Sequence, residues 1–313
     1  MTNSNLISII IPLFNEEDNL ENLIKKLIKN TKSIESKFEF IFVNDGSTDK
    51  SLNIIKKLKQ KNFKIISLVR NFGQTAAIMA GIDNSKGEII IMMDGDGQND
   101  PSDIDKLLDM IKNNGFDVVS GWRFKRNDSF FRVLFSKIAN KLLSFFLNLE
   151  LHDYGCTLKA YKRDIIKNIK LYGEMHRLIP FYAKLEGAKI GEVKVNHFSR
   201  RFGKSKYGMS RIFKVLLDTI LLVFFRRFIN KPIYFFGGVG LIFFFLSCLT
   251  FVYALKLKYL DSVSFIQTPL PILIIFFFIT SIMSVFFGII SEILSRTYHE
   301  SQGKKSYKIK SID

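Results

Sequence analysis

The sequence predicts an α/β domain with a mostly parallel sheet, followed by amphipathic helices and a two-helix transmembrane hairpin. Short apolar segments alternate with amphipathic stretches over residues 6–121, and two long segments near the C-terminus carry no charge. Continuously apolar strands separated by helices are typical of a parallel sheet that is covered on both faces. An uncharged segment of about 20 residues is long enough to cross the hydrocarbon core of a bilayer.

Five apolar segments are expected to form the strands of the sheet: 6–14, 38–44, 64–70, 88–94 and 116–121. A helix is expected after the first strand, because apolar residues between Leu20 and Ile28 recur at helical spacing. Asp100, next to Pro101, is expected to cap the start of a later helix. In sheets of this kind the ligand binds outside the carboxyl ends of the strands.

Three polar clusters follow strands at this edge of the sheet: PLFNEE (12–17), NDGSTD (44–49) and DGDGQND (94–100). Any one of them alone would be an ordinary polar loop that caps a helix. Because all three follow parallel strands, they favour one shared site.

The third cluster is neither a calcium loop nor a dinucleotide motif. In an EF-hand register, Asn99 stands where the turn needs glycine and Asp105 stands where the loop needs glutamate, and a strand precedes the loop instead of a helix. No GxGxxG follows the first strand. What remains is a D-x-D at the end of a strand.

This D-x-D has the chemistry of a divalent metal site. Asp94 and Asp96, with Gln98 beyond them, offer the oxygen ligands that Mg²⁺ and Mn²⁺ prefer. Gly95 and Gly97 leave room for the backbone and a phosphate to approach each other closely. The metal would neutralise charge on a departing nucleoside diphosphate.

Composition favours a membrane partner over nucleic acid. The chain carries 46 Lys+Arg against 29 Asp+Glu, a net charge of +17, together with 47% hydrophobic residues. This combination fits an anionic membrane face better than nucleic acid. The two cysteines imply no disulfide framework or zinc site, and the N-terminus is expected to form a strand, not a signal peptide.

Charge also predicts how the chain is organised around the membrane. Basic residues precede the first uncharged segment and follow the second, so the positive-inside rule places both termini in the cytoplasm and makes the chain a multi-pass protein of the cell inner membrane. The expected parts are a cytoplasmic domain over 1–207 with an interfacial helix at about 128–149, a juxtamembrane amphipathic helix over 208–231, two spans at about 233–255 and 269–291 within 232–292, and a basic tail over 293–313.

An ordered series of motifs resembles the family-2 glycosyltransferases of the GT-A fold: IPLFNEEDNL, FVNDGSTD, RNFGQTAAIMAGI, MDGDGQNDP and GWR. Within that group the chain is similar to the polyprenyl-phosphate glycosyltransferases, including the bactoprenol glucosyltransferases and dolichyl-phosphate mannose synthases. The segments DYGCTLKAYKR (153–163) and RRFGKSKYG (200–208), followed by two spans, match the undecaprenyl-phosphate formamido-arabinose transferases best. The resemblance covers nearly the whole chain.

The resemblance implies an inverting transfer of a sugar from a nucleotide sugar to a polyprenyl phosphate. It favours UDP over GDP in the donor and undecaprenyl phosphate as the lipid. It implies Mg²⁺ or Mn²⁺ as cofactor, and it allows a homo-oligomer. The nucleotide-sugar site would comprise Pro12, Phe14, Glu16, Val43, Asp45, Asp94, Gly95, Asp96 and Gln98, with Asp94, Asp96 and Gln98 at the metal. Gly95 replaces the alanine usual in relatives, and Asn44 replaces the first aspartate of their Asp-Asp-Gly-Ser motif.

By the same resemblance, the acceptor phosphate would meet Arg123, Arg132, Arg200, Arg201, Lys204 and Lys206, and catalysis would involve Asp96, Arg123 and Asp153. Asp153 matches a position proposed as a general base. The second pKa of a phosphate monoester is about 6, so the acceptor phosphate is largely a dianion near neutral pH and has little need of a base. The alternative role of Asp153 is to orient basic groups around the acceptor phosphate.

Two other functions compete with this interpretation. A polysaccharide synthase usually has more spans and a Q-x-x-R-W motif, whereas Trp122 is the single tryptophan here and the motif is absent. A non-catalytic membrane-anchored scaffold would not need Asp94, Asp96, Arg123 and Lys206 to be intact.

Overall fold

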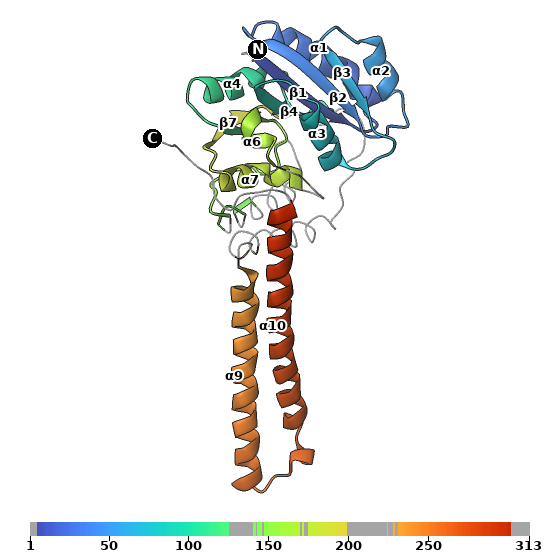
Figure 1. Cartoon of the computed structure of the whole chain (residues 1–313). Helices are drawn as coiled ribbons and strands as arrows, with labels where there is room; N and C mark the ends of the chain where they lie inside the picture. Colours follow the sequence, from blue (N-terminus) through green and yellow to red (C-terminus); the bar gives the residue numbers. More distant parts are fainter. Residues whose placement is uncertain are drawn as a thin grey trace. The chain divides into compact units, whose positions relative to one another are not determined.

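The chain forms two compact units, Met1–Asp218 and Thr219–Asp313, which are described separately (Figure 1). The computed structural model describes residues 5–124, 140–169 without 142 and 146, 171, 175–198, 224, 228 and 231–301. The expected interfacial helix lies mostly outside these residues, as do the juxtamembrane helix and most of the basic tail. Arg132, Arg200, Arg201, Lys204 and Lys206 also lie outside them.

The first unit is built on a seven-stranded sheet with the order β3-β2-β1-β4-β6-β5-β7. Its strands are β1 Leu6–Leu13, β2 Lys37–Asn44, β3 Phe63–Ser67, β4 Ile89–Met92, β5 Val118–Arg123, β6 Lys159–Lys162 and β7 Ile190–Val195. Every neighbouring pair is parallel except the two that involve β6. The five expected strands and the mostly parallel sheet are confirmed. Strands β6 and β7 do not stand out in the sequence, because they are short and carry several charged residues.

Helices cover both faces of this sheet. Helices α1 (Glu17–Thr31), α2 (Ser51–Lys57) and α4 (Ile104–Lys112) pack on one face, and α3 (Gln74–Asp83), α6 (Arg163–Ile166) and α7 (Ile179–Leu185) pack on the other. Two 3₁₀ turns, η1 (Pro101–Asp103) and η2 (Met175–Leu178), precede α4 and α7. Asp100 caps η1 by accepting a hydrogen bond from the backbone N–H of Ser102 at 3.1 Å, which confirms the predicted cap.

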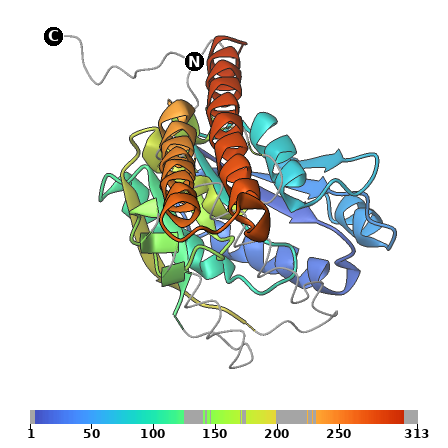
Figure 2. The ribbon, with the colours of Figure 1, turned by 90° about the horizontal axis from the view of Figure 1, so that it is seen from below.

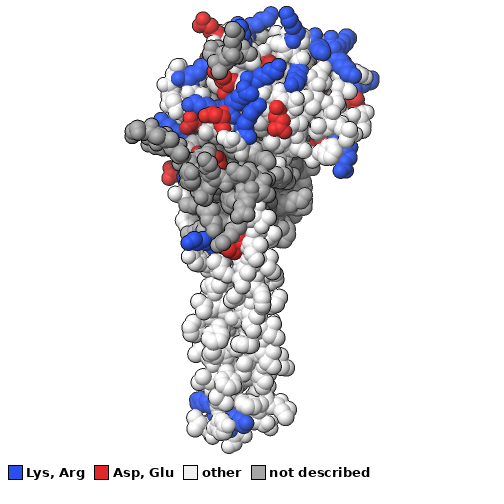
Figure 3. All heavy atoms as spheres, in the orientation of Figure 1, with Lys and Arg blue, Asp and Glu red and all other residues white. Residues whose placement is uncertain are grey.

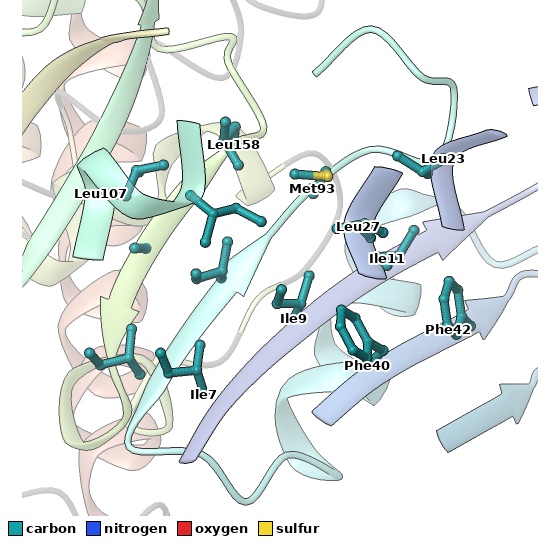
Figure 4. Packing of buried hydrophobic residues seen from close by; sticks show 14 of the residues in the cluster. Ile7, Ile9, Ile11, Leu23, Leu27, Phe40, Phe42, Met93, Leu107 and Leu158 are labelled. Atoms are coloured by element: carbon teal, nitrogen blue, oxygen red, sulfur yellow. The ribbon is translucent and has the colours of Figure 1, made fainter. Parts of the chain in front are cut away.

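Strand β1 illustrates why the apolar segments fold as buried strands. Ile7, Ile9 and Ile11 point to the α1 face, where Leu23 and Leu27 pack in the same cluster, and Ile10 belongs to the core on the opposite face (Figure 4). Successive side chains of a strand point to opposite faces, so a strand that is covered on both faces must be apolar throughout.

The second unit is a helical hairpin. Helix α9 (Pro232–Tyr259) and helix α10 (Leu270–Ser301) lie side by side and are joined by η3 (Phe265–Gln267), as Figures 1 and 2 show. Both helices are long and apolar enough to cross a membrane. Only 11% of the most apolar 18-residue segment is buried in α9, and 17% in α10. The core helix of a soluble protein would be mostly buried, so these helices are candidate membrane spans. They overlap the predicted spans, with α10 beginning one residue after the predicted start at 269, and the hairpin surface is nearly uncharged between its ends (Figure 3).

Close approach of the two helices depends on small residues. A Cβ atom on Gly240 of α9 would lie 3.1 Å from the backbone oxygen of Ser281 on α10. Ser247 donates a hydrogen bond to the backbone oxygen of Ile274 at 3.0 Å. Small residues at a helix contact let the backbones approach, which is the usual source of packing energy between helices in lipid.

The Gly87→Ala variant tests the packing of β1 against β4. A Cβ atom on Gly87 would lie 2.5 Å from the backbone nitrogen of Ser8, so the two segments would have to separate. We expect a loss of about 1–3 kcal/mol in the free energy of unfolding, as for an overpacked core. Trp122 is the single tryptophan and lies in β5, so its fluorescence reports unfolding of this unit in the full chain.

Lys86→Ala is the matched control, because this neighbouring side chain is exposed. Its free energy of unfolding should stay within about 0.5 kcal/mol of the original protein. Equal stability of the Gly87 and Lys86 variants would contradict the close approach of β1 and β4.

Candidate active site

The polar loops that follow β1 and β2 are hydrogen-bonded to each other. Asn15 accepts from the backbone N–H of Thr48 at 2.8 Å, and its own N–H donates to the Ser47 hydroxyl at 3.0 Å. Asp49 accepts from the N–H of Glu17 at 3.0 Å. Two of the three polar clusters found in the sequence therefore form one connected edge of the sheet.

Asp45 joins this edge to the segment before α3. Its two carboxylate oxygens accept from the backbone N–H groups of Phe72 at 2.7 Å and Gly73 at 2.9 Å. Gly46, with φ of 68°, lies against the same segment, since a Cβ atom there would be 2.5 Å from the Arg70 carbonyl carbon. Asp45 thus positions the start of α3, and its predicted contact with a nucleoside stays a prediction.

Asp94 lies where this edge meets α3 and β6. One of its oxygens accepts from the Gln74 amide at 2.7 Å and the other accepts from the Thr157 hydroxyl at 2.7 Å. Burial, followed by the charge of Asp96, raises the pKa of Asp94 to about 6. The hydrogen bond from Thr157 and then the charges of Arg123 and Arg177 lower this pKa only partly. Ionised Asp94 is therefore held in place by the fold but is electrostatically unfavourable.

The second carboxylate, Asp96, is 8% exposed and shapes the loop that follows. It accepts from the backbone N–H of Gln98 at 3.1 Å, across Gly97, whose φ of 74° favours glycine. The Gln98 side chain donates to the backbone oxygen of Phe198 at 3.3 Å. Gln98 is thus on the acidic loop, but its role as a third metal ligand stays a prediction.

Arg123 and Asp153 form an ion pair in which the carboxylate is buried and the guanidinium is partly buried. Arg123 Nε donates to Asp153 Oδ2 at 2.6 Å, and Arg123 Nη2 donates to Asp153 Oδ1 at 2.8 Å. The backbone N–H of Gly155 also donates to Oδ1, at 3.0 Å, and Asp153 is 2% exposed. Paired contacts of this kind fix the plane of the guanidinium group. Both residues are among the predicted site residues, but their pairing with each other is not apparent from the sequence.

The segment from Asp153 to Thr157 connects this ion pair to the acidic loop. Asp153 at its start binds Arg123, and Thr157 at its end donates to Asp94. Five consecutive residues therefore bring the carboxylates that follow β4 and the arginine that ends β5 into one site. Thr157 and Gln74 were not predicted as site residues, although both lie within motifs that carry the family resemblance.

The remaining predicted residues lie around this site. Pro12 and Val43 are buried register partners at the ends of β1 and β2. Glu16 accepts from the Asn19 amide at 2.9 Å, and Phe14 is half-buried. Gly95 packs against β1, since a Cβ atom there would lie 2.1 Å from Leu13 Cδ2. An alanine at this position would require Leu13 to shift.

The donor set fits a divalent cation that shares its shell with a substrate. Asp94 and Asp96 are hard oxygen donors that repel each other, and a cation would relieve this repulsion. Within the described ranges, no group of three His, Cys, Asp or Glu side chains is arranged to hold a metal. A protein shell of two carboxylates suits Mg²⁺ or Mn²⁺, which are commonly bound through one or two carboxylates plus substrate phosphates.

Comparison with known proteins gives three findings. The family described as "Glycosyl transferase family 2" matches residues 8–170. Dodecaprenyl-phosphate galacturonate synthase of Rhizobium johnstonii is 38% identical over 312 residues, which cover 98% of this chain and 92% of that protein. Undecaprenyl-phosphate 4-deoxy-4-formamido-L-arabinose transferase of Proteus mirabilis is 30% identical over 315 residues, which cover 98% of this chain and 94% of that protein.

Solved structures share the fold of the first unit. Glucosyl-3-phosphoglycerate synthase from Mycobacterium tuberculosis, crystallised with Mn²⁺, uridine diphosphate and phosphoglyceric acid, superposes with a TM-score of 0.54 at 20% identity. The match covers 69% of this chain and 78% of that one. The same protein crystallised with Mg²⁺ and uridine diphosphate gives a TM-score of 0.54 at 18% identity. This match covers 69% of this chain and 79% of that one.

The Asp94→Asn variant tests whether the charge on Asp94 costs stability. A carboxyl whose pKa is raised in the folded state binds its proton more tightly when folded, so ionisation destabilises the fold as pH rises from about 4 to above 6. Without metal at about pH 7.5, we expect Asp94→Asn to be more stable than the original protein by up to about 3 kcal/mol. The gain should shrink towards about pH 4.5.

Trp122 fluorescence during thermal unfolding in EDTA would measure this difference. Asp105→Asn, at an exposed position of α4, removes an equal charge from the same unit and serves as control. An Asp94→Asn variant that is less stable than the Asp105→Asn variant at both pH values would contradict the proposed electrostatic cost.

Proposed function

The chain belongs to glycosyl transferase family 2, and we propose that this glycosyltransferase transfers a sugar, with inversion, from a nucleotide sugar to a polyprenyl phosphate. The proposed donor is UDP-linked and the proposed lipid is undecaprenyl phosphate. Both relatives described above are named for polyprenyl-phosphate products or substrates and match over nearly their full length. The first unit is a GT-A-like domain, and the two candidate spans fit a lipid acceptor.

The observation that carries this proposal is the segment from Asp153 to Thr157. It holds the Arg123 guanidinium and the Asp94 carboxylate within one site. Sugar transfer to a phosphate needs both kinds of group, because the donor diphosphate requires a cation-binding loop and the acceptor phosphate requires a positive charge.

The donor side of the site is assigned to the loops after β1, β2 and β4. We assign the nucleotide pocket to Pro12, Phe14, Glu16, Val43 and Asp45, on the edge where Asn15 and Asp49 connect two loops. Rigid loops hold a nucleotide without a large ordering cost on binding. Gly97 would let the diphosphate approach the backbone of the acidic loop, since a Cβ atom there would meet only Asn19 Cβ, at 4.0 Å.

Asp94 and Asp96 are proposed to hold Mg²⁺ or Mn²⁺, with Gln98 as a further oxygen ligand. When bound, the metal would offset negative charge on the leaving nucleoside diphosphate. Gln74 and Thr157 would keep the Asp94 carboxylate oriented, because each donates to one of its oxygens.

On the acceptor side, Arg123 is proposed to bind the lipid phosphate. This phosphate must approach a loop that carries two carboxylates, and Arg123 would offset that repulsion. Arg132, Arg200, Arg201, Lys204 and Lys206 remain proposed partners of the same phosphate.

Asp153 is proposed to orient Arg123 and not to remove a proton. Its oxygens already accept from Arg123 and from the backbone of Gly155, so little acceptor capacity remains. The acceptor also has little need of a base, because a phosphate monoester is largely a dianion near neutral pH. The remaining requirement is for correctly placed positive charge.

We place the reaction at the cytoplasmic face of the inner membrane. The basic residues on either side of the hairpin favour cytoplasmic termini, and Lys256 and Lys258 are the only basic residues near its loop. A polyprenyl phosphate carries its phosphate at headgroup level, so a catalytic unit anchored by α9 and α10 would work next to its acceptor.

The Asp96→Asn variant tests the function together with the metal assignment. We expect it to reduce transfer of labelled sugar from a panel of UDP- and GDP-sugars to a short polyprenyl phosphate by about 100-fold or more, because a metal ligand is lost. The measurement uses the purified full chain in detergent.

Asp100→Asn is the matched control for this experiment. Asp100 lies four residues away on the same loop and caps η1, and asparagine is an equally good cap. Transfer by this variant should be near that of the original protein. Undiminished transfer by Asp96→Asn would refute the metal assignment, and inactivity of the original protein towards the whole panel, without nucleotide binding, would favour a scaffold.

A further inference from the structure

A glutamate that the chemistry described so far does not use, Glu192 of β7, binds the start of the segment from Asp153 to Thr157. Its oxygens accept from the backbone N–H of His152 at 3.0 and 3.1 Å and from the backbone N–H of Asp153 at 3.1 Å. Its Oε2 also lies 2.7 Å from the His152 ring nitrogen Nδ1. An ionised carboxylate only accepts hydrogen bonds, so Nδ1 carries the proton in this contact. Three N–H groups of two consecutive residues thus meet on one carboxylate.

The sheet itself holds Glu192 in place. Glu192 is the register partner of Ser120 in the parallel pair of β5 and β7. Its side chain is 11% exposed, whereas that of His152 is 65% exposed. A carboxylate with so little access to water needs hydrogen bonds from the protein, and here the segment supplies them. The segment is therefore attached to the sheet by a side chain that belongs to the sheet.

The residues bound by Glu192 face the end of β5 as two neighbouring pairs. Asp153 pairs with Arg123 at 2.6 Å, and the residues that precede them, His152 and Trp122, stack with ring centroids 4.1 Å apart and planes at 16°. The backbone N–H of Arg123 lies 3.4 Å from Asp153 Oδ2. Since Glu192 accepts from both His152 and Asp153, it fixes the backbone from which the Asp153 side chain reaches Arg123.

The contacts favour positioning over proton transfer as the role of Glu192. A histidine that pairs with a carboxylate can act as a general base. The proposed acceptor has little need of one, because its phosphate is largely a dianion near neutral pH. Two of the three N–H groups that Glu192 binds belong to the backbone, and these contacts move no proton.

We propose that Glu192 is a positioning residue for the acceptor phosphate, because it holds Asp153 where its carboxylate orients Arg123. The inference rests on the proposed function, which takes Arg123 as the group that meets the lipid phosphate.

The donor side of the site should depend little on Glu192. The far end of the segment is anchored by β6, which begins two residues after Thr157. Asp94 also keeps its hydrogen bond from Gln74, at 2.7 Å. Loss of Glu192 should therefore weaken binding of the acceptor and leave binding of the nucleotide unchanged.

The test compares the affinity of Glu192 variants for the two ligands. A short polyprenyl phosphate, and UDP with Mn²⁺, are titrated separately against the purified full chain in detergent. Glu192→Met removes the acceptor oxygens, so we expect it to bind the polyprenyl phosphate about 10-fold or more weakly, as for the loss of hydrogen bonds to a charged group. Its affinity for UDP should not change. In the transfer assay, the KM for the polyprenyl phosphate should rise and the KM for the nucleotide sugar should stay the same.

The conservative variant Glu192→Gln should retain most of the acceptor affinity. The amide oxygen can accept from the backbone N–H groups of His152 and Asp153, and the amide nitrogen can donate to the His152 ring. A general base formed by His152 and Glu192 would instead need the carboxylate, so transfer would be lost in Glu192→Gln.

Glu150→Met is the matched control, because it removes the same charge at an exposed position two residues before His152. This variant should bind both ligands as the original protein does. Thermal unfolding followed by Trp122 fluorescence would establish that each variant is folded.

Binding and transfer separate this inference from the proposed function. Unchanged acceptor affinity in Glu192→Met would overturn the inference, as would an equal loss of UDP affinity, which indicates a general structural role, or a loss in Glu192→Gln as large as in Glu192→Met. Any of these results, with sugar transfer by the original protein, would leave the proposed function intact. Binding of polyprenyl phosphate that depends on Glu192, without transfer of any sugar, would support the inference and contradict the proposed function. An original protein that binds no polyprenyl phosphate would contradict both.

Discussion

The repulsion between Asp94 and Asp96 is the constraint on which the rest of the site depends. Burial and the neighbouring carboxylate together raise the pKa of Asp94, so the ionised pair is unfavourable until a cation joins it. The surrounding structure nevertheless fixes Asp94 with hydrogen bonds from Gln74 and Thr157. Hydrogen bonds that hold an unfavourable charge in place are typical of a functional site and not of a structural one.

The architecture of the sheet explains how such a site can be rigid. The parallel strands β1, β2 and β4 end at the same edge, and hydrogen bonds between their loops hold this edge together. The antiparallel strand β6 is preceded by the segment that binds both Arg123 and Asp94. Acidic and basic groups with opposite tasks are thus placed by a scaffold that is buried on both faces, and not by independent loops.

Much of this could be predicted from the sequence, because the informative features are local. The five apolar strands, the cap at Asp100 and the candidate spans each follow from a short pattern of residues. Strand β6 could not be predicted in this way, since Lys159 looks like a surface residue and is buried only by its neighbours in the sheet. The contact between Thr157 and Asp94 joins residues 63 positions apart, and no local pattern reveals it. Five of the predicted basic residues lie outside the described part of the chain and stay predictions.

The most direct test of this account is the metal dependence of nucleotide binding to the full chain. If the Asp94–Asp96 pair needs a cation before it can accept a diphosphate, UDP should bind about 100-fold more tightly with Mn²⁺ or Mg²⁺ than in EDTA, which corresponds to several kcal/mol of charge stabilisation. Uridine, which has no phosphate, should show no such dependence. Equal affinity for UDP with and without a divalent metal would contradict the central claim that the two carboxylates form a shared metal site.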